Sequence, residues 1–346
     1  AAYGWYYIES RLSPTVAKSL SALLSRPVEM GELESFSLTS LSFGETIIPP
    51  TEDNSEAVTI PAINVDFTPF KLLTEQTIEL DVTLVRPEIA VEQTPEGKWI
   101  TTELTPQPAG AIEIKLNSLA VENASLSLSP RTPSGELKAP VNLTLPKLTS
   151  QFRDNNQRIS FQAQNLSVTD GQGSLNLEGE ARLDSGEVDL AVTSNQLAIG
   201  ELARLVSSPL DMIAGTLDAN TNIAFSLDGS LPSFEGRAQF KNGEAKLDQF
   251  TTAITNTNAD VQFAGKDIIV QEFNTKFGEV SAKAQGSINL DQGYDLTANV
   301  EPTAVSRLLT AVDLDPSQIP ISGTIAAQID ITGELNNPQL NITANS

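Results

Sequence analysis

The side chains that could do chemistry in this chain are carboxylates and hydroxyls, because the sequence contains no cysteine and no histidine. Thiol nucleophiles, Ser-His and Cys-His pairs, and metal sites built on His or Cys are therefore excluded. A carboxylate enzyme or a Ca²⁺ site remains open. Asp313 and Asp315 are the best Ca²⁺ candidates, but they lack the ligand spacing of an EF-hand, and a solvated turn explains them better. We predict no catalytic residue, no metal, no cofactor and no enzymatic activity.

Net charge excludes a further class of partner. The 346 residues include 21 basic and 44 acidic side chains, which gives a formal charge of -23. Binding to nucleic acid, or to anionic headgroups by charge, depends on Lys and Arg contacts with phosphate. The sequence therefore predicts no nucleic-acid partner.

Strand-like alternation is clearest from Gly215 to Leu247. Its apolar residues fall on every second position: Leu217, Ala219, Ile223, Phe225 and Leu227. That period is typical of a strand with one face buried and the other in water. Asp228-Gly229 and Asn242-Gly243 favour positive φ and predict tight hairpin turns.

An internal repeat is suggested by a second stretch of the same plan, Gly323 to Ile342, which starts 108 positions after Gly215. Upstream of each copy lies a strand, an Asp-x-Gly turn (Asp184 to Gly186, Asp291 to Gly293) and another strand. Each then enters a segment of helical period, 197–206 or 303–312. One unit is thus two or more strands, a short helix and more strands. A generic β-rich chain with common turn residues is the alternative.

The remainder of the chain also predicts mostly strands with few short helices. Ser13-Pro14 begins a helix that ends at Pro27. Strand patterns follow, and residues 103–111 read as a Pro/Gly linker. One strand is expected before Asn123-Ala124 and another after it, with a turn between them. Each of these strands has one apolar face that must be kept from water, and the chain has too few helices to bury all of these faces. Either a closed sandwich or barrel, or an open trough lined with apolar residues, satisfies the pattern.

Aromatic residues cluster at the start of the chain, at Tyr3, Trp5, Tyr6 and Tyr7. Such clusters are typical of the membrane interface next to a transmembrane helix. No run of 18 apolar residues exists, so we expect the anchor to lie upstream of residue 1. The alternative is an aromatic cluster that packs on the first helix.

Several stretches resemble the AsmA-like family, and within it the TamB type (translocation and assembly module) of cyanobacteria and chloroplasts. The stretches are SRPVEMGELESFSLTSLSFG from Ser25, FKLL from Phe70, IELDVTLVRPEIAVEQ from Ile78, EGKW from Glu96, SLDGSLPSF from Ser226 and DITGELNNPQL from Asp330. The likeness touches most of the chain, and its specificity lies in the combination rather than in any one stretch.

The resemblance implies a mostly β fold, an elongated, curled, taco-like antiparallel sheet of repeated strand units that forms a groove. It implies a membrane-proximal segment and helix over 1–27, an AsmA-like N-terminal β region over 28–111, and a continuous repeated groove over 112–346. It further implies a periplasmic protein anchored to the inner membrane. The implied partners are phospholipid and, through a C-terminal region not recognisable here, an Omp85-type outer-membrane barrel.

Apolar residues of the alternating strands are the candidate site, since they would line the groove; ordinary core is their alternative role. The expected lining residues are Leu175, Leu177, Leu183, Leu190, Val192, Leu217, Ile223, Phe225, Leu227, Ile288, Leu290, Leu296, Ile325, Ile329 and Ile331. We expect the protein to conduct phospholipid between two membranes. The alternative is a structural or chaperone module that helps assemble or translocate outer-membrane proteins. About twenty strands at ~4.8 Å each would make a trough on the order of 100 Å long.

Overall fold

The computed structural model describes residues 21, 26–51, 54–68, 77–99, 113–132, 134–154, 157–205, 210–226, 231–247, 249–319 and 321–345. Twenty strands of one predominantly antiparallel sheet make up most of these residues, which confirms the expected fold class. The strands are β1 (Leu33–Phe36), β2 (Ser40–Phe43), β3 (Thr46–Ile48), β4 (Ala57–Ile60), β5 (Ala62–Phe67), β6 (Thr77–Val85), β7 (Glu88–Glu92), β8 (Glu113–Ser129), β9 (Val141–Arg153), β10 (Arg158–Val168), β11 (Ser174–Arg182), β12 (Glu187–Ala198), β13 (Leu210–Ser226), β14 (Ser233–Leu247), β15 (Ile254–Gly265), β16 (Asp267–Phe277), β17 (Val280–Asn289), β18 (Gly293–Ala304), β19 (Thr324–Gly333) and β20 (Gln339–Asn345).

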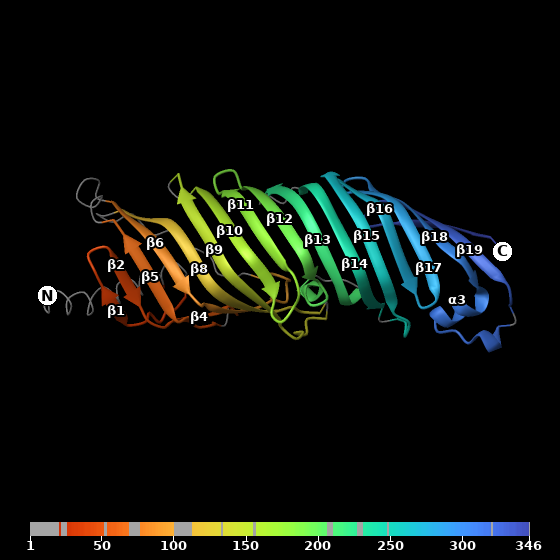
Figure 1. The fold of residues 1–346 in the computed structure, drawn as a ribbon, viewed down its shortest axis with the longest axis horizontal. Coiled ribbons are helices and arrows are strands. Elements are labelled where there is room, and N and C mark those ends of the chain that lie inside the picture. Colours follow the sequence, from red (N-terminus) through yellow and green to blue (C-terminus); the bar gives the residue numbers. More distant parts are fainter. Residues whose placement is uncertain are drawn as a thin grey trace. The chain divides into compact units, whose positions relative to one another are not determined.

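The chain divides into two compact units. Figure 1 labels most of their strands. Unit 1 comprises Ala1–Thr169 and Glu178–Asp184, and unit 2 comprises Asp170–Leu177 and Ser185–Ser346. The division passes through β11, whereas the family resemblance places its boundaries after residues 27 and 111.

Unit 1 is built around the long strand β8. Its first half pairs in parallel with β6 and its second half in parallel with β7, while β9 pairs antiparallel along the other edge. From β6 the antiparallel order continues through β5 and β2 to β1, and from β7 through β4 to β3. The sheet of unit 1 is therefore branched, and these two parallel pairings depart from the expected all-antiparallel pattern.

A filled core closes the N-terminal part of unit 1. Leu33, Phe43, Ile60 and Ile63 are buried together, and Phe43 is only 1% exposed. Half-buried apolar residues of β2, β4, β5 and β6 pack around them. This part of the chain is an ordinary hydrophobic core, so alternation alone does not distinguish lining from core.

Unit 2 is a simple antiparallel meander. From β12 to β20 each strand pairs with the next one along the chain. The first and last strands of this series are not partners in the described pairings, so the meander is open rather than closed into a barrel. Asp-x-Gly turns join β11 to β12 and β17 to β18, and Gly186 and Gly293 adopt the positive φ expected there.

The expected repeat is present in the order of the elements. One copy runs through β11, β12, the 3-10 helix η1 (Leu202–Leu205), β13 and β14. The other runs through β17, β18, the α-helix α3 (Val305–Ala311), β19 and β20, with a 3-10 turn η2 (Pro316–Gln318) after α3. The helical segment expected over 303–312 is confirmed. The one expected over 197–206 shrinks to η1, because Leu197 and Ala198 remain in β12.

Two predicted turns are wrong. Asn123-Ala124 lies inside the 17-residue strand β8, and Asn242-Gly243 lies inside β14. Asn123 and Asn242 do have positive φ, 55° and 54°. At Asn242 the left-handed conformation coincides with a register shift and forms a bulge. At Asn123 the pairing of β8 with β9 keeps its register, so the strand continues through a single residue of left-handed conformation.

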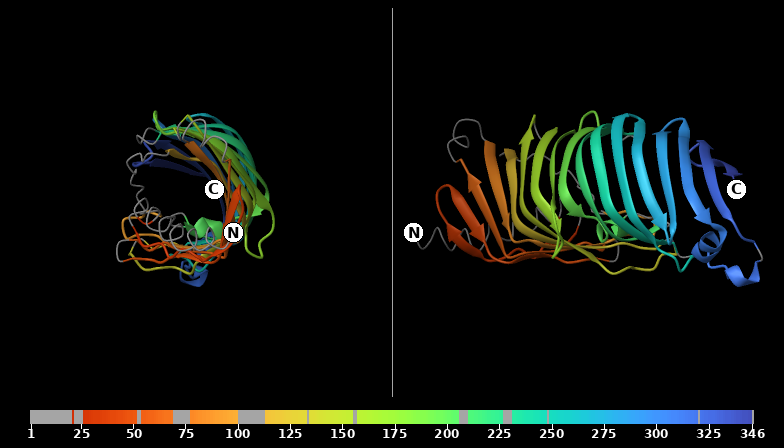
Figure 2. Two further views of the ribbon diagram at one scale, coloured as in Figure 1. Left: turned by 90° about the vertical axis from the view of Figure 1, so that its left-hand side faces the viewer. Right: turned by 45° about the vertical axis from the view of Figure 1, so that its right-hand side comes forward.

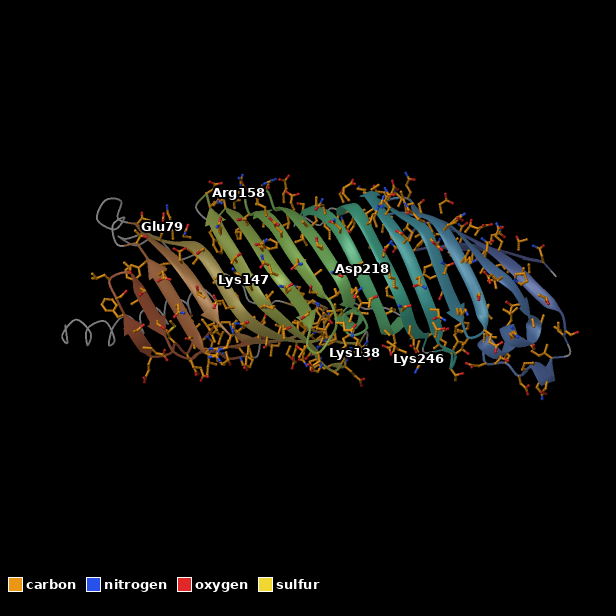
Figure 3. The ribbon with its side chains drawn as sticks, in the orientation of Figure 1. Glu79, Lys138, Lys147, Arg158, Asp218 and Lys246 are labelled. Carbon is orange, nitrogen blue, oxygen red and sulfur yellow. The ribbon has the colours of Figure 1, made fainter. Side chains whose placement is uncertain are left out.

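The sheet of unit 2 is curved, with an outer and an inner face. In the left panel of Figure 2, the green to teal strands of this unit bow outward to the right. That side of the sheet is the one that faces the viewer in Figure 1. Asp218 lies on that side in Figure 3. Residues in register with Asp218, and those two positions away along each strand, are therefore on the outer, convex face.

Some expectations fall outside the described residues. They are the aromatic cluster at Tyr3, Trp5, Tyr6 and Tyr7, nearly all of the helix from Ser13 to Pro27, the 103–111 linker, Leu227 and Asp228-Gly229. Among the helices of the described ranges, none has both the length and the apolar character needed to cross a membrane.

Candidate functional site

The inner face of unit 2 is a continuous apolar surface. Register places an apolar or small residue opposite another across every strand pair from β12 to β20; for example, Ile223 faces Phe234, and Ile329 faces both Ala298 and Ile342. Its members are Val188, Leu190, Val192, Ser194, Leu197, Leu217, Ala219, Thr221, Ile223, Phe225, Phe234, Gly236, Ala238, Phe240, Ala259, Val261, Phe263, Ile268, Val270, Phe273, Ala282, Ala284, Gly286, Ile288, Tyr294, Leu296, Ala298, Val300, Ile325, Ala327, Ile329, Ile331, Leu340, Ile342 and Ala344. No Asp, Glu, Lys or Arg is among these described positions.

Most of this face is only half-buried. Of its apolar side chains, Leu197 is the one that reaches the buried class, at 4% exposed, whereas Ile223, Phe225 and Leu296 remain partly accessible. At the far end, on β20, Leu340 is 65% exposed and Ile342 is 62% exposed. Apolar surface left in water is unfavourable by roughly 25 cal/mol per Å². An extended one-faced surface of this kind is typical of a binding site for an apolar ligand.

Hydroxyl groups on or beside this face do not make it polar, because a backbone carbonyl of the neighbouring strand or a neighbouring hydroxyl satisfies them. Ser194 donates to the carbonyl of Leu217 at 3.0 Å, and Thr221 donates to the carbonyl of Arg237 at 3.3 Å. Thr257 shares a hydrogen bond of 2.8 Å with Thr275. The surface offered to a ligand is therefore hydrocarbon in character, with few hydrogen-bonding groups.

The outer face of the same strands is polar and charged. On β14, Glu235, Arg237, Gln239 and Lys241 occupy the alternate, exposed positions. The corresponding positions on β13 include Asp218, which pairs with Lys241 at 3.0 Å. The strict division between the two faces keeps the charges in water and leaves the inner face uncharged.

Register places ten of the fifteen expected lining residues on the inner face of unit 2. They are Leu190, Val192, Leu217, Ile223, Phe225, Ile288, Leu296, Ile325, Ile329 and Ile331. Leu175 and Leu177 are half-buried in β11. Leu183 and Leu290 lie just beyond strand ends, and Leu183 is 53% exposed.

Several aromatic members of the inner face were missed by sequence reasoning. Phe234 and Phe263 come from neighbouring strands, with ring centroids 5.8 Å apart. Phe240 and Phe273 lie further along the same face. Their signal was present in the alternation of β14 to β16, but bulges in these strands shift its phase, so no single alternating pattern runs through them.

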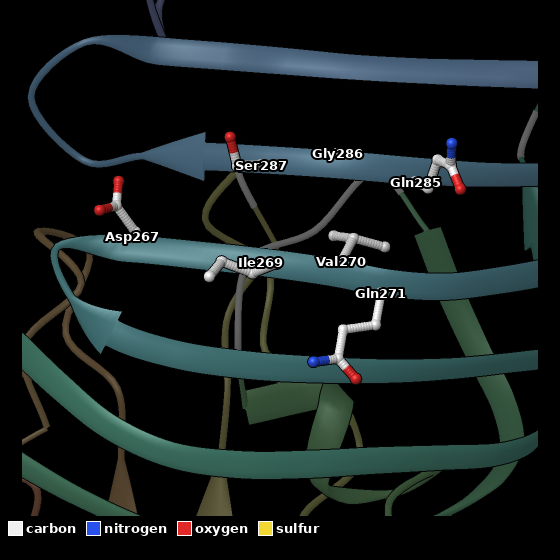
Figure 4. Close-up of a pocket in the computed structure, with 7 residues that line it drawn as sticks. All are labelled: Asp267, Ile269, Val270, Gln271, Gln285, Gly286 and Ser287. Carbon is white, nitrogen blue, oxygen red and sulfur yellow. The ribbon is translucent and has the colours of Figure 1, made fainter.

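A hollow of about 620 Å³ with mixed polar and apolar lining lies on unit 2 between β16 and β17 (Figure 4). It is lined by Asp267, Ile269, Val270, Gln271, Gln285, Gly286 and Ser287. Of these, Asp267, Gln271 and Gln285 are exposed. The side chains do not converge on a common point in the close-up, so the hollow has no arrangement of reactive groups.

Carboxyl groups in the described residues show no arrangement suited to catalysis or metal binding. No cluster of acidic side chains there could hold a metal ion. Asp313 accepts hydrogen bonds from the backbone N–H of Thr251 at 2.8 Å and from its hydroxyl, and these bonds lower its pKa. Asp315 accepts from the N–H of Ser317 at 2.9 Å, which lowers its pKa and starts the turn η2. Asp315 stabilises a turn, as the solvated-turn interpretation predicts, whereas Asp313 ties the turn after α3 to the segment between β14 and β15.

Comparison with known proteins gives a distant similarity. No protein-family model matches the chain. It is 21% identical over 138 residues to "Protein TIC236, chloroplastic" of Arabidopsis thaliana, and 21% identical over 138 residues to "Protein SUBSTANDARD STARCH GRAIN 4, chloroplastic" of Oryza sativa subsp. japonica. Each match covers 39% of this chain and only 6% of the relative. The chain is therefore similar to a small part of two much longer chloroplast proteins.

Proposed function

We propose that the inner face of unit 2 binds the acyl chains of phospholipids, and that the protein conducts these lipids between two membranes. The proposal depends on one observation: a half-exposed apolar surface continues over nine strands without a charged side chain. Acyl chains gain roughly 0.8 kcal/mol for each CH₂ removed from water, so such a surface favours them. Headgroups would remain in water, outside the apolar surface.

The cellular setting of this proposal comes from the family resemblance. We infer an AsmA-like protein of TamB type, located in the periplasm and anchored to the inner membrane through a segment upstream of residue 1. An Omp85-type barrel is the proposed outer-membrane partner. Similarity to two chloroplast proteins supports this inference, because the resemblance is to a group with chloroplast members.

A matched pair of substitutions tests lipid binding. Ile223→Asp places a carboxylate on the inner face, while Ala224→Asp places one on the exposed outer face of the same strand. A charge among acyl chains is costly, but at a half-exposed position it can still reach water, so both variants should fold. We expect Ile223→Asp to lose bound phospholipid in native mass spectrometry and to lose transfer of a fluorescent phospholipid between vesicles. Ala224→Asp should retain both.

Circular dichroism decides the alternative role of the same residue. If Ile223→Asp loses its β spectrum together with lipid binding, Ile223 is an ordinary core residue and the proposal is wrong. Wild-type protein that carries no phospholipid and takes up none from vesicles would also contradict it.

A structural or chaperone-like module that helps assemble or translocate outer-membrane proteins is the second candidate, because the same uncharged, half-exposed inner face could also hold the apolar side chains of an unfolded polypeptide. Under this alternative, an unfolded outer-membrane protein should bind the wild type and bind Ile223→Asp less well. The wild type should then transfer no phospholipid between vesicles.

A further inference from the structure

A line of bulges crosses four neighbouring strands of unit 2, inside β13 and β14 and near one end of β12 and of β15. Gln196 in β12, Gly215 in β13, Asn242 in β14 and Asn256 in β15 all have positive φ, at 47°, 143°, 54° and 51°. The register of the corresponding strand pairs shifts at each of these places. A bulge adds one residue to a strand, bends it and increases its local twist. Bulges that lie side by side therefore bend neighbouring strands along a common line, which we call the crease.

The crease also reverses the alternation of faces. On β14, inner-face residues have even numbers up to Phe240, whereas beyond Asn242 the buried residues, Gly243 and Ala245, have odd numbers. On β12 the inner face changes from Ser194 to Leu197 across Gln196. The extra residue keeps apolar side chains inside on both arms of the bent strand.

Side chains of the next strand hold the bulged backbone. The N–H of Gln196 donates to Oδ1 of Asp218 at 2.7 Å, and Nζ of Lys241 binds the other oxygen of Asp218 at 3.0 Å. In the same way the N–H of Asn242 donates to Oδ1 of Asn258 at 3.1 Å. The amide of Asn258 in turn donates to the carbonyl of Asn256 at 3.0 Å. Each brace lies on the outer face and binds an N–H at a bulge.

We infer that this braced crease sets the curvature of unit 2, and that the curvature sets how much lipid its inner face holds. Asp218 and Asn258 are positioning residues, because they act through the backbone and lie on the face away from the ligand. The first half of the inference concerns the fold alone, while the second half rests on the proposed lipid binding.

Two substitutions at Asn242 separate the effect of its positive φ from the effect of losing its side chain. Asn242→Val replaces the amide side chain by a branched hydrocarbon and disfavours positive φ, since β-branched residues rarely adopt it. Asn242→Gly removes the same side chain but permits positive φ. Because the chain has no cysteine, spin labels can be introduced at the exposed positions Asp211 and Asn222, which flank the crease on β13. If the crease sets the bend, Asn242→Val should lengthen this separation toward the ~36 Å of eleven straight strand residues, and Asn242→Gly should leave it unchanged.

The brace is tested separately in case Asn242→Val fails to fold. Asp218→Ala should lengthen the label separation, while Asp218→Asn, which retains an acceptor for the Gln196 N–H, should lengthen it less. An unchanged label separation in folded Asn242→Val or in Asp218→Ala would overturn the inference that the crease sets the curvature of unit 2.

Bound phospholipid, counted by native mass spectrometry, tests the second half. Variants with a lengthened separation should lose lipid, and Asn242→Gly should retain it. A lengthened separation with unchanged bound lipid would overturn the inference that curvature sets how much lipid the inner face holds. It would not contradict the role of the crease in curvature or lipid binding itself. Absence of lipid from the wild type would refute the proposed function alone, because the label separations do not depend on lipid.

Discussion

At the residue scale, one buried ion pair fastens the start of unit 1. The Arg26 side chain is 2% exposed and the Glu56 side chain 8% exposed, and their charged groups are 3.3 Å apart. Arg26 also donates to the carbonyls of Pro49, at 2.6 Å, and of Glu56. One guanidinium thus ties the chain before β1 to the loop between β3 and β4.

Arg26→Met should destabilise unit 1 strongly. It removes the cation that lies 3.3 Å from the buried Glu56 carboxylate, and removal of one member of a buried ion pair typically costs about 3–5 kcal/mol. Adding Glu56→Leu removes that charge and should recover part of the loss. Urea titrations of the single and double variants measure both steps. Equal stability of the two variants would show that the loss comes from the carbonyl contacts rather than from the Glu56 charge.

Asp218 should make the crease sensitive to acid. The N–H of Gln196 and the ammonium of Lys241 stabilise its carboxylate, which lowers its pKa from the ordinary 3.8. A lowered pKa means that the carboxylate stabilises the fold above the ordinary value, and that this stabilisation is lost as pH falls through the lowered one. The NMR shift of the Gln196 amide should therefore titrate below pH 3.8 in the wild type. Asp218→Asn should abolish that titration, and its persistence would assign it to another acid.

At the scale of single strands, the two units use similar apolar alternation for different purposes. Phe43 of β2 is 1% exposed in a filled core, whereas Phe240 of β14 is half-buried on the inner face, where its ring occupies the space that a Cβ at Gly215 or Gly243 would need. The same residue type should therefore give different results when truncated.

Phe43→Ala should cost about 3–5 kcal/mol of folding stability, because it leaves a cavity in a closed core. Phe240→Ala should cost less, since solvent or lipid already reaches the site, but it should reduce lipid binding. Denaturant unfolding and native mass spectrometry on both variants give the comparison. An equal stability loss would mean that the inner face of unit 2 is packed as tightly as the core of unit 1.

How far the sequence predicts these strands depends on the kind of signal. Period-two alternation identified the inner-face residues such as Ile223 and Ile329, because a strand fixes the face of every second residue. It could not tell Asn123 and Asn242 from turn residues, since Asn with positive φ also occurs inside strands. The parallel pairings of β8 with β6 and β7 could not be predicted either, because alternation within a strand does not show which distant strand it pairs with. For the same reason, lining and core residues looked alike until their burial was known.

At the scale of the whole chain, lipid should stabilise the two units unequally. A ligand that binds only the folded state at 100 times its Kd adds about 2.7 kcal/mol, and the inner face assigned to lipid belongs to unit 2. Both tryptophans, Trp5 and Trp99, fall within the sequence range of unit 1, and Tyr294 is the one tyrosine of unit 2. Added phospholipid should raise the melting temperature reported by Tyr294 more than that reported by the tryptophans. Equal shifts would contradict lipid binding confined to unit 2.

The meander of unit 2 also determines how this part of the chain can be made. Each strand from β12 to β20 finds its partner in the segment synthesised just before or after it. Contacts between sequence neighbours keep the contact order low and the entropy cost of loop closure small. A polypeptide delivered N-terminus first, from a ribosome or a secretion pore, can therefore add one strand at a time to an edge that is already folded. At every stage the exposed edge is the template for the next segment to emerge.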